Sequence, residues 1–204
     1  MRRTKEEARE TRLRILESAL DIFSEKCYSN ASLTEIAEHV GLSKGALYWH
    51  FKNKNDLLLQ LIETLCRGNE RNLESIMQNP EDAHKLKNYF MTELTRPLTD
   101  NRYQKIHRLM QRRNEWPEEI QLKVRAMVAD SIARDKKMVK TLIERGQKEG
   151  TIRKDLSSEA VAVLFSSIFH GLCVMQLSGL LPKEFPGYTD ILFDAMTREL
   201  ATKI

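Results

Sequence analysis

The sequence predicts an all-α protein, built from a small N-terminal unit, a long connecting helix and a larger helical unit. Three observations support this fold class. Apolar residues recur at helical spacing along almost the whole chain of 204 residues. Runs in which β-branched residues alternate with polar ones are absent, and so is the Asn-Gly pair typical of a hairpin. Serine, asparagine, glycine and proline residues stand where helices are expected to begin and end.

The N-terminal unit is expected to hold three helices within residues 1–52. The first spans about residues 5–26 and has an apolar stripe of Leu13, Leu16, Leu20 and Phe23. Ser32 opens a capping box that starts the second helix, and Gly41 ends that helix. Ser43 is the N-cap of a short third helix that runs to about His50. Two short helices joined by a tight turn are the arrangement of a helix-turn-helix.

Asn53 is expected to cap a long fourth helix, so a second unit is predicted over residues 53–204. Pro80 ends the fourth helix, and Pro97 ends the fifth. The further helices are expected at about residues 81–96, 101–115, 117–146, 157–179 and 187–203.

Composition and charge exclude several classes of protein. With 41% hydrophobic and 30% charged residues, the chain is globular rather than disordered. A net charge of +4 is compatible with nucleic acid but does not require it. The three cysteines lie far apart without CxxC spacing, and the charged N-terminus lacks the apolar core of a secretory signal. A cytoplasmic protein is therefore expected.

Residues 160–182 contain no Asp, Glu, Lys or Arg and are long enough to span a bilayer. Serine, histidine and glutamine residues interrupt this stretch, and no aromatic belt flanks it. A buried helix of a soluble protein is therefore favoured over a membrane span, and no membrane partner is expected.

The segment LSKGALYWHF, residues 42–51, places two aromatic residues side by side on a short helix. At 100° per residue, Leu47 and Phe51 share one face, which can pack on apolar residues of the second helix. These are Ile36, Ala37 and Val40. Tyr48 and Trp49 then lie on a surface that the N-terminal unit leaves open. In one interpretation Trp49 packs under another helix. In the other, which fits the neighbouring residues better, this surface packs on DNA.

In the second interpretation, the third helix enters the major groove of double-stranded DNA. Lys44 would favour phosphate or base-edge acceptors, and Gly45 would let the helix approach closely. The Tyr48 hydroxyl would reach a phosphate and its ring a thymine methyl group. His50 and Lys54 would hold backbone phosphates beyond the helix.

The stretch SLTEIAEHVGLSKGALYWHFKNKNDLL resembles the DNA-binding segment of TetR-family transcriptional repressors. Within it, ALYWHFKNK looks most like the branch that includes repressors of multidrug efflux pumps. The resemblance covers about residues 8–66. It implies an all-α homodimer with a three-helix head at residues 1–52 and a ligand-binding and dimerisation body at residues 53–204. The last two long helices, near 157–179 and 187–203, would form the dimer interface as a four-helix bundle.

By this resemblance, the DNA-contacting positions lie around the second and third helices and at the start of the fourth. They are Ser32, Thr34, Ser43, Lys44, Gly45, Tyr48, Trp49, His50 and Lys54.

Cys27 departs from the family pattern, which commonly has glycine after the first helix. A left-handed backbone at this position would cost a residue other than glycine roughly 1 kcal/mol. Either the turn differs or the protein tolerates the strain. A redox switch at Cys27 is the less favoured alternative to a plain substitution, because the sequence shows no partner cysteine or cationic cluster nearby.

The body is expected to bind a small, largely apolar effector that releases the protein from a palindromic operator. Its candidate residues are the Met, aromatic and isolated polar side chains on apolar helices. They are Tyr89, Phe90, His107, Met110, Gln111, Trp116, Met138, Phe165, Phe169 and His170. Each of them also fits an ordinary core. An effector of this kind would suit a repressor that controls the gene of an efflux pump. The alternative is a DNA-binding protein whose body binds a protein partner instead of a small molecule.

No enzyme is expected. The five histidines show neither HExxH nor His/Cys ligand spacing, and GxSxG, P-loop and GxGxxG motifs are absent. The sequence therefore predicts no catalytic residue, no metal site and no cofactor.

Overall fold

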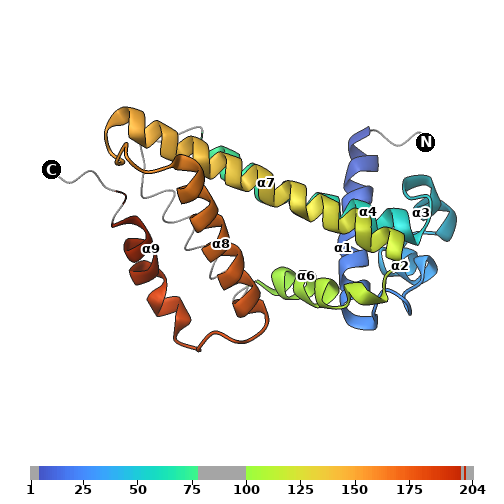
Figure 1. Ribbon diagram of the computed structural model, residues 1–204. Helices are drawn as coiled ribbons and strands as arrows, with labels where there is room; N and C mark the ends of the chain where they lie inside the picture. The colour runs from blue at the N-terminus through green and yellow to red at the C-terminus, as the bar shows by residue number, and fades with distance from the viewer. Residues whose placement is uncertain (1–4, 78–99, 199, 201–204) are drawn as a thin grey trace. The chain divides into compact units, whose positions relative to one another are not determined.

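The computed structural model in Figure 1 describes residues 5–77, 100–198 and 200, and within these ranges it contains helices and no β-strand. The all-α prediction is confirmed. The helices are α1 (Lys5–Lys26), α2 (Leu33–His39), α3 (Lys44–His50), α4 (Lys54–Met77), α6 (Asn101–Gln111), α7 (Glu118–Glu149), α8 (Ser158–Leu177) and α9 (Thr189–Thr197). Two 3-10 helices, Arg113–Glu115 and Phe185–Tyr188, precede α7 and α9.

The predicted helix bounds hold in the N-terminal part and shift further on. α7 ends at Glu149 rather than near Gly146, and Gly150 takes the left-handed conformation with φ +79°. Gly146 lies inside α7, where a Cβ would come within 2.7 Å of Ile152 Cδ1. It is a packing glycine rather than a terminator. The helix expected at 101–115 ends at Gln111, and the last one starts at Thr189. The helix expected at 81–96 lies outside the described residues.

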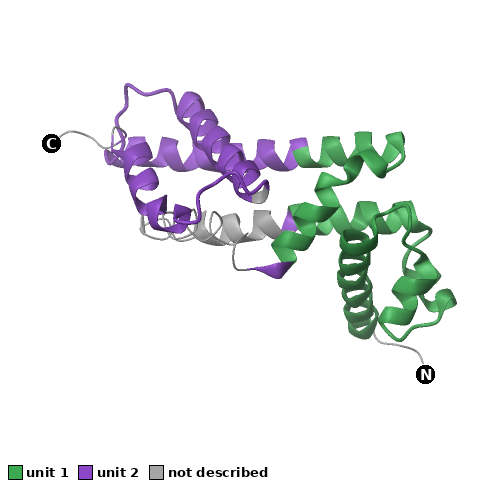
Figure 2. Ribbon diagram, turned by 90° about the horizontal axis from the view of Figure 1, so that it is seen from below, with its two compact units in different colours: residues 1–66, 102–128 green, residues 67–101, 129–204 purple. Residues whose placement is uncertain are grey.

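The chain divides into two compact units, shown in green and purple in Figure 2. Unit 1 comprises the chain up to Cys66 together with Arg102–Val128, and unit 2 comprises Arg67–Asn101 and the chain from Ala129. This division differs from the predicted boundary at residues 52/53. The reason is that the first half of α4 buries Leu57, Leu58, Leu61 and Ile62 in the same core as α1 to α3.

The core of unit 1 is built from residues of helices α1, α2, α3 and α4, together with residues of α6 and α7. Ile15, Leu16, Leu20 and Phe23 of α1 are fully buried in it. The predicted stripe is wrong at Leu13, whose side chain is 44% exposed because the buried face of α1 is centred nearer Ile15 and Ala19. From the second segment of the unit, the buried residues are Leu109, Trp116, Ile120 and Val124.

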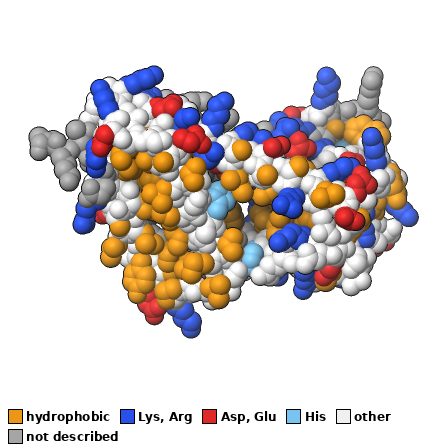
Figure 3. Space-filling view, viewed as in Figure 1, with side chains coloured by type: hydrophobic (Ala, Val, Ile, Leu, Met, Phe, Trp, Pro, Cys, Tyr) orange, Lys and Arg blue, Asp and Glu red, His pale blue; other side chains and the backbone are white. Residues whose placement is uncertain are grey.

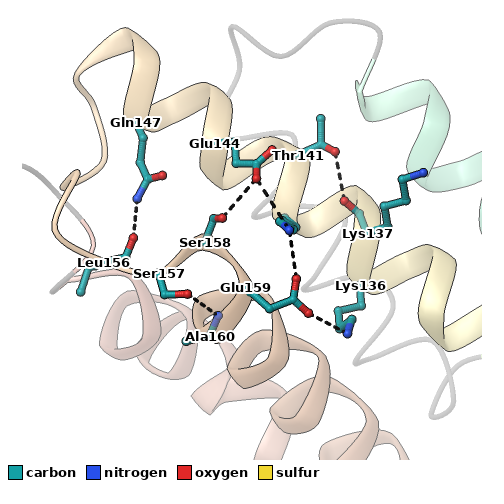
Figure 4. A network of polar contacts seen from close by, with 11 residues as sticks. Lys136, Lys137, Thr141, Glu144, Gln147, Leu156, Ser157, Ser158, Glu159 and Ala160 are labelled. Carbon is teal, nitrogen blue, oxygen red and sulfur yellow. Dashed lines mark hydrogen bonds and ion pairs between the residues drawn. The ribbon is translucent and has the colours of Figure 1, made fainter.

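In unit 2, a polar network joins α7 to the start of α8 (Figure 4). Glu159 accepts a hydrogen bond from Lys136 Nζ at 2.9 Å and pairs with Lys140 Nζ at 3.2 Å. These two cations hold the pKa of the Glu159 carboxyl below its usual range. Gln147 Nε2 donates to the Leu156 carbonyl at 2.8 Å. The network fixes the direction in which α8 leaves α7.

α8 is only partly buried within the single chain, whereas a buried helix was expected at 160–182. One side packs on α7 and α9 through Val161, Phe165 and Phe169. The other side carries an exposed stripe whose members are spaced alternately by four and three residues: Ala160, Leu164, Ser167, Gly171 and Val174. Figure 3 shows the hydrophobic side chains gathered over α8 and α9. Within the described ranges, α8 is the one helix whose length and composition would suit a membrane span.

Candidate DNA-binding site

Both helices of the helix-turn-helix start at serine caps. The Ser32 Oγ accepts from the Glu35 amide at 3.1 Å, and the Ser43 Oγ accepts from the Ala46 amide at 3.2 Å. Between the helices, Gly41 has φ +71°, a left-handed conformation that glycine adopts without a steric cost. The caps and the turn therefore form as the local sequence predicts.

α3 has the two faces that its sequence predicts. Leu47 and Phe51 are fully buried, together with Ile36 and Ala37 of α2, whereas Val40 is only half-buried. On the opposite side, Tyr48 is 47% and Trp49 74% exposed. The interpretation that packs Trp49 under another helix is therefore not supported in unit 1, and both aromatic rings are available to a partner.

The side chains around these aromatics are arranged by contacts within α3. Lys44 Nζ lies over the Tyr48 ring, 6.0 Å from its centroid. The Trp49 and His50 rings meet edge to face, with centroids 4.7 Å apart. At Gly45, a Cβ would meet only the Ser43 Oγ, at 4.0 Å. The fold itself therefore does not require glycine at position 45.

The nine predicted DNA-contacting residues fall into two groups by their solvent exposure. Ser32, Ser43, Lys44, Gly45, Tyr48 and Trp49 are exposed. Thr34, His50 and Lys54 are half-buried. All except Lys54 belong to the two short helices and their caps.

Lys54, which was predicted to contact a phosphate, binds backbone carbonyl groups in the free protein. Its ammonium donates to the carbonyl oxygens of Tyr28 at 2.8 Å, Ala31 at 3.0 Å and Ser29 at 3.3 Å. An ammonium has three N–H donors, so this set is complete. Burial lowers the pKa of Lys54. In the free protein this side chain holds the turn between α1 and α2.

Residues of α1 fix α2 through contacts that the sequence pattern does not predict. Arg14 Nη2 donates to the Val40 carbonyl, at the end of α2, at 2.9 Å. Lys26 pairs with Glu35 in the first turn of α2, which raises the pKa of Lys26 and lowers that of Glu35. Arg12 lies over the Phe51 ring at 5.3 Å. These basic residues orient the helix-turn-helix by contacts from α1.

α6 is bound along α1 by ion pairs. Arg102 Nη2 lies 2.9 Å from Glu17 Oε1, and Lys105 Nζ lies 2.6 Å from Asp21 Oδ1. The partners are 84 to 85 residues apart in sequence, so no local sequence pattern predicts these ion pairs. Together these pairs attach the second segment of unit 1 to its first helix.

Cys27 occupies the left-handed turn after α1, with φ +70°. The turn is therefore the one typical of glycine, and the chain tolerates its strain. Arg112 Nη1 donates to the Cys27 Sγ at 3.0 Å and lies 3.4 Å from the Glu25 carbonyl oxygen. This cation, which lies 85 residues from Cys27 in sequence, supports the end of α1.

The residues predicted to line an effector site are divided between the two units. His107, Met110, Gln111 and Trp116 belong to unit 1. Met138, Phe165, Phe169 and His170 belong to unit 2. Tyr89 and Phe90 lie outside the described residues.

Several of these candidates have structural roles of their own. Trp116 is 3% exposed, and its Nε1–H has no hydrogen-bond acceptor within the described part of the chain. His170 Nδ1 donates to the Ser166 carbonyl at 2.7 Å, which is the contact expected of a helix histidine on an apolar face. Gln111 is exposed, and Phe165 is a core residue of unit 2. Over the described ranges, no three His, Cys, Asp or Glu side chains gather as metal ligands.

The pKa of His107 is lowered by burial and, second, by the neighbouring Arg108. At pH values between the usual histidine pKa of 6.5 and the lowered pKa of the folded state, His107 binds a proton in the unfolded chain but not in the folded one. The free energy of unfolding should therefore decrease as the pH falls below about 6.5, and less so in His107→Gln. Urea unfolding of both proteins at several pH values measures this. A His107 resonance that titrates above 6.5 would contradict it.

Comparison with known proteins agrees with this geometry. Residues 15–61 match the family model of bacterial regulatory proteins of the tetR family. The HTH-type transcriptional regulator AcrR of Shigella flexneri is 32% identical over 203 residues, covering 95% of this chain and 92% of that protein. The HTH-type transcriptional repressor BepR of Brucella suis is 29% identical over 184 residues, covering 88% and 86%.

Solved structures share the fold over most of the chain. NalD, described as the secondary repressor of the MexAB-OprM multidrug efflux pump in Pseudomonas aeruginosa, aligns with a TM-score of 0.73 at 21% identity. The alignment covers 96% of this chain and 99% of NalD. The match to the family model and the similarity to AcrR over nearly the full length of both proteins show that the chain belongs to the tetR family of bacterial transcriptional regulators.

Proposed function

We propose that the protein is a repressor that binds a near-palindromic operator as a homodimer and leaves it when a small, largely apolar effector binds the body. The observation that carries the DNA contact is the exposed surface of Lys44, Gly45, Tyr48 and Trp49 on a helix whose other face is buried. Adjacent exposed aromatics are unfavourable in water, and a base edge or a sugar-phosphate backbone would cover them.

The proposed DNA contacts are Ser32, Thr34, Ser43, Lys44, Gly45, Tyr48, Trp49 and His50, from the two short helices. One such helix reads few base pairs, so useful specificity needs two of them about 34–36 Å apart on the duplex, or at a wider spacing. A two-fold dimer provides this arrangement.

The exposed stripe of α8 supports a homodimer. Its spacing of four and three residues is the seam along which two helices pack, and the small Ser167 and Gly171 at its middle would allow a close approach. α9 adds Ile191, which is also exposed. We propose that α8 and α9, from the predicted segments 157–179 and 187–203, pair with their copies, so that protein rather than lipid covers them.

The proposed control of an efflux pump is supported by the relatives rather than by the site. NalD is named a repressor of a multidrug efflux pump. A largely apolar effector that carries one hydrogen-bond acceptor would suit the buried Trp116, because its indole N–H lacks an acceptor within the described residues. The second candidate function, a body that binds a protein partner, would use the same apolar face of α8. A monomer with that face free at micromolar concentration would favour it.

Sequencing of the DNA fragments that the purified protein retains would test the proposal. Enrichment of one inverted repeat, upstream of a transporter operon, is the expected result. Retention of all fragments alike would contradict sequence-specific regulation.

Gly45→Ala offers a substitution that separates DNA binding from folding. Since the space around Gly45 is open, the stability of the free protein should be unchanged or rise by up to about 1 kcal/mol. Binding to the selected operator should weaken by roughly 1–3 kcal/mol, because the added methyl group would overpack a close contact with DNA. Thermal unfolding and fluorescence anisotropy measure the two effects.

Tyr48→Ala is the companion variant for this test. It should lose more affinity for the selected operator than for random DNA, because the ring is placed next to the bases. Equal losses on both duplexes, or a Gly45→Ala protein with unchanged operator affinity, would show that α3 does not lie in the groove as proposed.

A further inference from the structure

Lys54 is the first residue of α4, a place where a positive charge is unfavourable. The N-terminus of a helix carries a partial positive charge, so an acidic or neutral residue would suit this position better. The helix already has its cap, since the Asn53 Oδ1 accepts from the Asp56 amide at 2.9 Å. The lysine therefore has a reason for its place other than the stability of α4.

That reason is visible in the turn between α1 and α2. Three carbonyl groups of this turn, from Tyr28, Ser29 and Ala31, converge on the Lys54 ammonium. A partly buried carbonyl without a donor is costly, and here one side chain donates to the partly buried carbonyls of Tyr28 and Ala31 and to the exposed one of Ser29. The turn leads directly into Ser32, the cap of α2.

Tyr28 closes the other side of this arrangement. The Lys54 Nζ lies 4.4 Å from the centroid of the Tyr28 ring, which adds a cation–π contact. The ring is almost fully buried and packs on Phe23, with centroids 5.4 Å apart. The Tyr28 hydroxyl donates to the Asn55 Oδ1, the residue next to Lys54 on α4. Two consecutive residues of α4 are thus bound to one turn.

We propose that Lys54 is a positioning residue for DNA recognition, and that it holds the α1–α2 turn against the first turn of α4 instead of holding a phosphate. Loss of the ammonium would loosen the turn, and α2 and α3 would no longer be presented in one orientation. The effect on DNA rests on the proposed function, whereas the effect on the turn does not.

The test compares Lys54→Met with Lys52→Met. Lys52 is exposed and its removal takes away the same charge two residues earlier in the chain. Three quantities are measured in the full-length protein: the unfolding midpoint, the hydrogen exchange of the Ala31 amide, and the affinity for the selected operator over a range of salt concentrations. The Ala31 amide reports on the turn because it donates to the Cys27 carbonyl at 3.3 Å.

Lys54→Met should lower the unfolding midpoint by about 4–8 °C and accelerate exchange at Ala31 at least about tenfold. Operator affinity should fall while the slope of log K against log salt stays that of the unmodified protein. Lys52→Met should leave the midpoint and the exchange unchanged. A phosphate contact gives the opposite pattern: an unchanged midpoint in Lys54→Met and a slope shallower by about one. That pattern would overturn the proposal.

Lys54→Arg decides the matter if Lys54→Met does not fold. It keeps the charge, but a planar guanidinium cannot direct three donors from one nitrogen to three converging carbonyls. A lower midpoint with an unchanged salt slope supports the proposal, and wild-type stability and exchange in Lys54→Arg overturn it. If the unmodified protein selects no DNA, the proposed function fails, but the midpoint and the exchange rate still test the role of Lys54.

Discussion

Val174→Asp is expected to convert the protein into a folded monomer that no longer binds its operator. Val174 is 63% exposed in the single chain and contributes to neither core cluster of unit 2, so an aspartate there should leave the subunit intact. In the proposed dimer the same position is covered by the copy of α8. Each dimer would then bury two unpaired carboxylates, at a cost of roughly 3–5 kcal/mol apiece.

The loss of operator binding follows from the loss of the dimer. A single α3 contacts one half-site, and without the second half-site the affinity falls towards that for random DNA, by about 10³-fold or more. Sedimentation at micromolar concentration, circular dichroism and operator binding measure the three consequences. Val174→Thr, with nearly the same volume and no charge, is the matched control and should stay dimeric.

Phe165→Asp separates an interface effect from a folding effect. Phe165 is buried among Ile143, Val161 and Leu200, so a charge there should unfold unit 2 rather than dissociate folded subunits. A Val174→Asp protein that remains dimeric and keeps its operator affinity would exclude α8 as the interface and favour the protein-partner alternative.

Insertion of Gly-Ser-Gly after Arg67 is expected to abolish release by the effector without abolishing effector binding. α4 runs without a break from Lys54 to Met77 and crosses from unit 1 to unit 2 between Cys66 and Arg67. In the proposed mechanism an effector in the body acts on α3 through this helix. A preference of about 1–3 kcal/mol for the state that binds DNA poorly would weaken operator binding roughly 5–150-fold. The flexible insertion should reduce that ratio to about one.

The measurement uses an apolar fluorescent dye that releases the operator from the unmodified protein. Dye affinity in the absence of DNA should be retained in the insertion variant. The same tripeptide inserted after Lys183, an exposed residue between α8 and α9, serves as control and should release normally. Undiminished release in the Arg67 variant would show that α4 is not the transmitting element, and that the signal passes by another route.

The parts of the fold that depend on neighbouring residues were predictable. The caps at Ser32, Ser43 and Asn53 were identified because a cap and its amide lie three residues apart. The two faces of α3 follow from helical periodicity. Unit 1 extends beyond residue 52, because Leu57 and Leu61 are buried in the same core as α1, which no local pattern encodes.

Contacts between distant segments escaped prediction for the same reason. Arg14 and Val40 lie 26 residues apart, and Arg112 and Cys27 lie 85 apart. For Lys54 the sequence indicated a positive charge but not its three carbonyl partners. The absence of charged residues over residues 160–182 predicted that this helix is covered, but hydrophobic periodicity does not tell whether the covering surface belongs to the same chain.

The two-segment construction of unit 1 limits how this regulator can be recombined with its relatives. An isolated fragment ending at Cys66 would expose the core surface that Trp116 and Ile120 cover and would leave Glu17 and Asp21 without Arg102 and Lys105. In the fragment, two uncompensated acidic groups would then face solvent on the helix that supports α2. A chimera joined at residue 52 would set that surface and these two acidic residues against the relative's residues instead. Exchange of operator specificity between family members is therefore better attempted by substituting the outward residues of α3 within an intact chain than by transplanting the N-terminal segment.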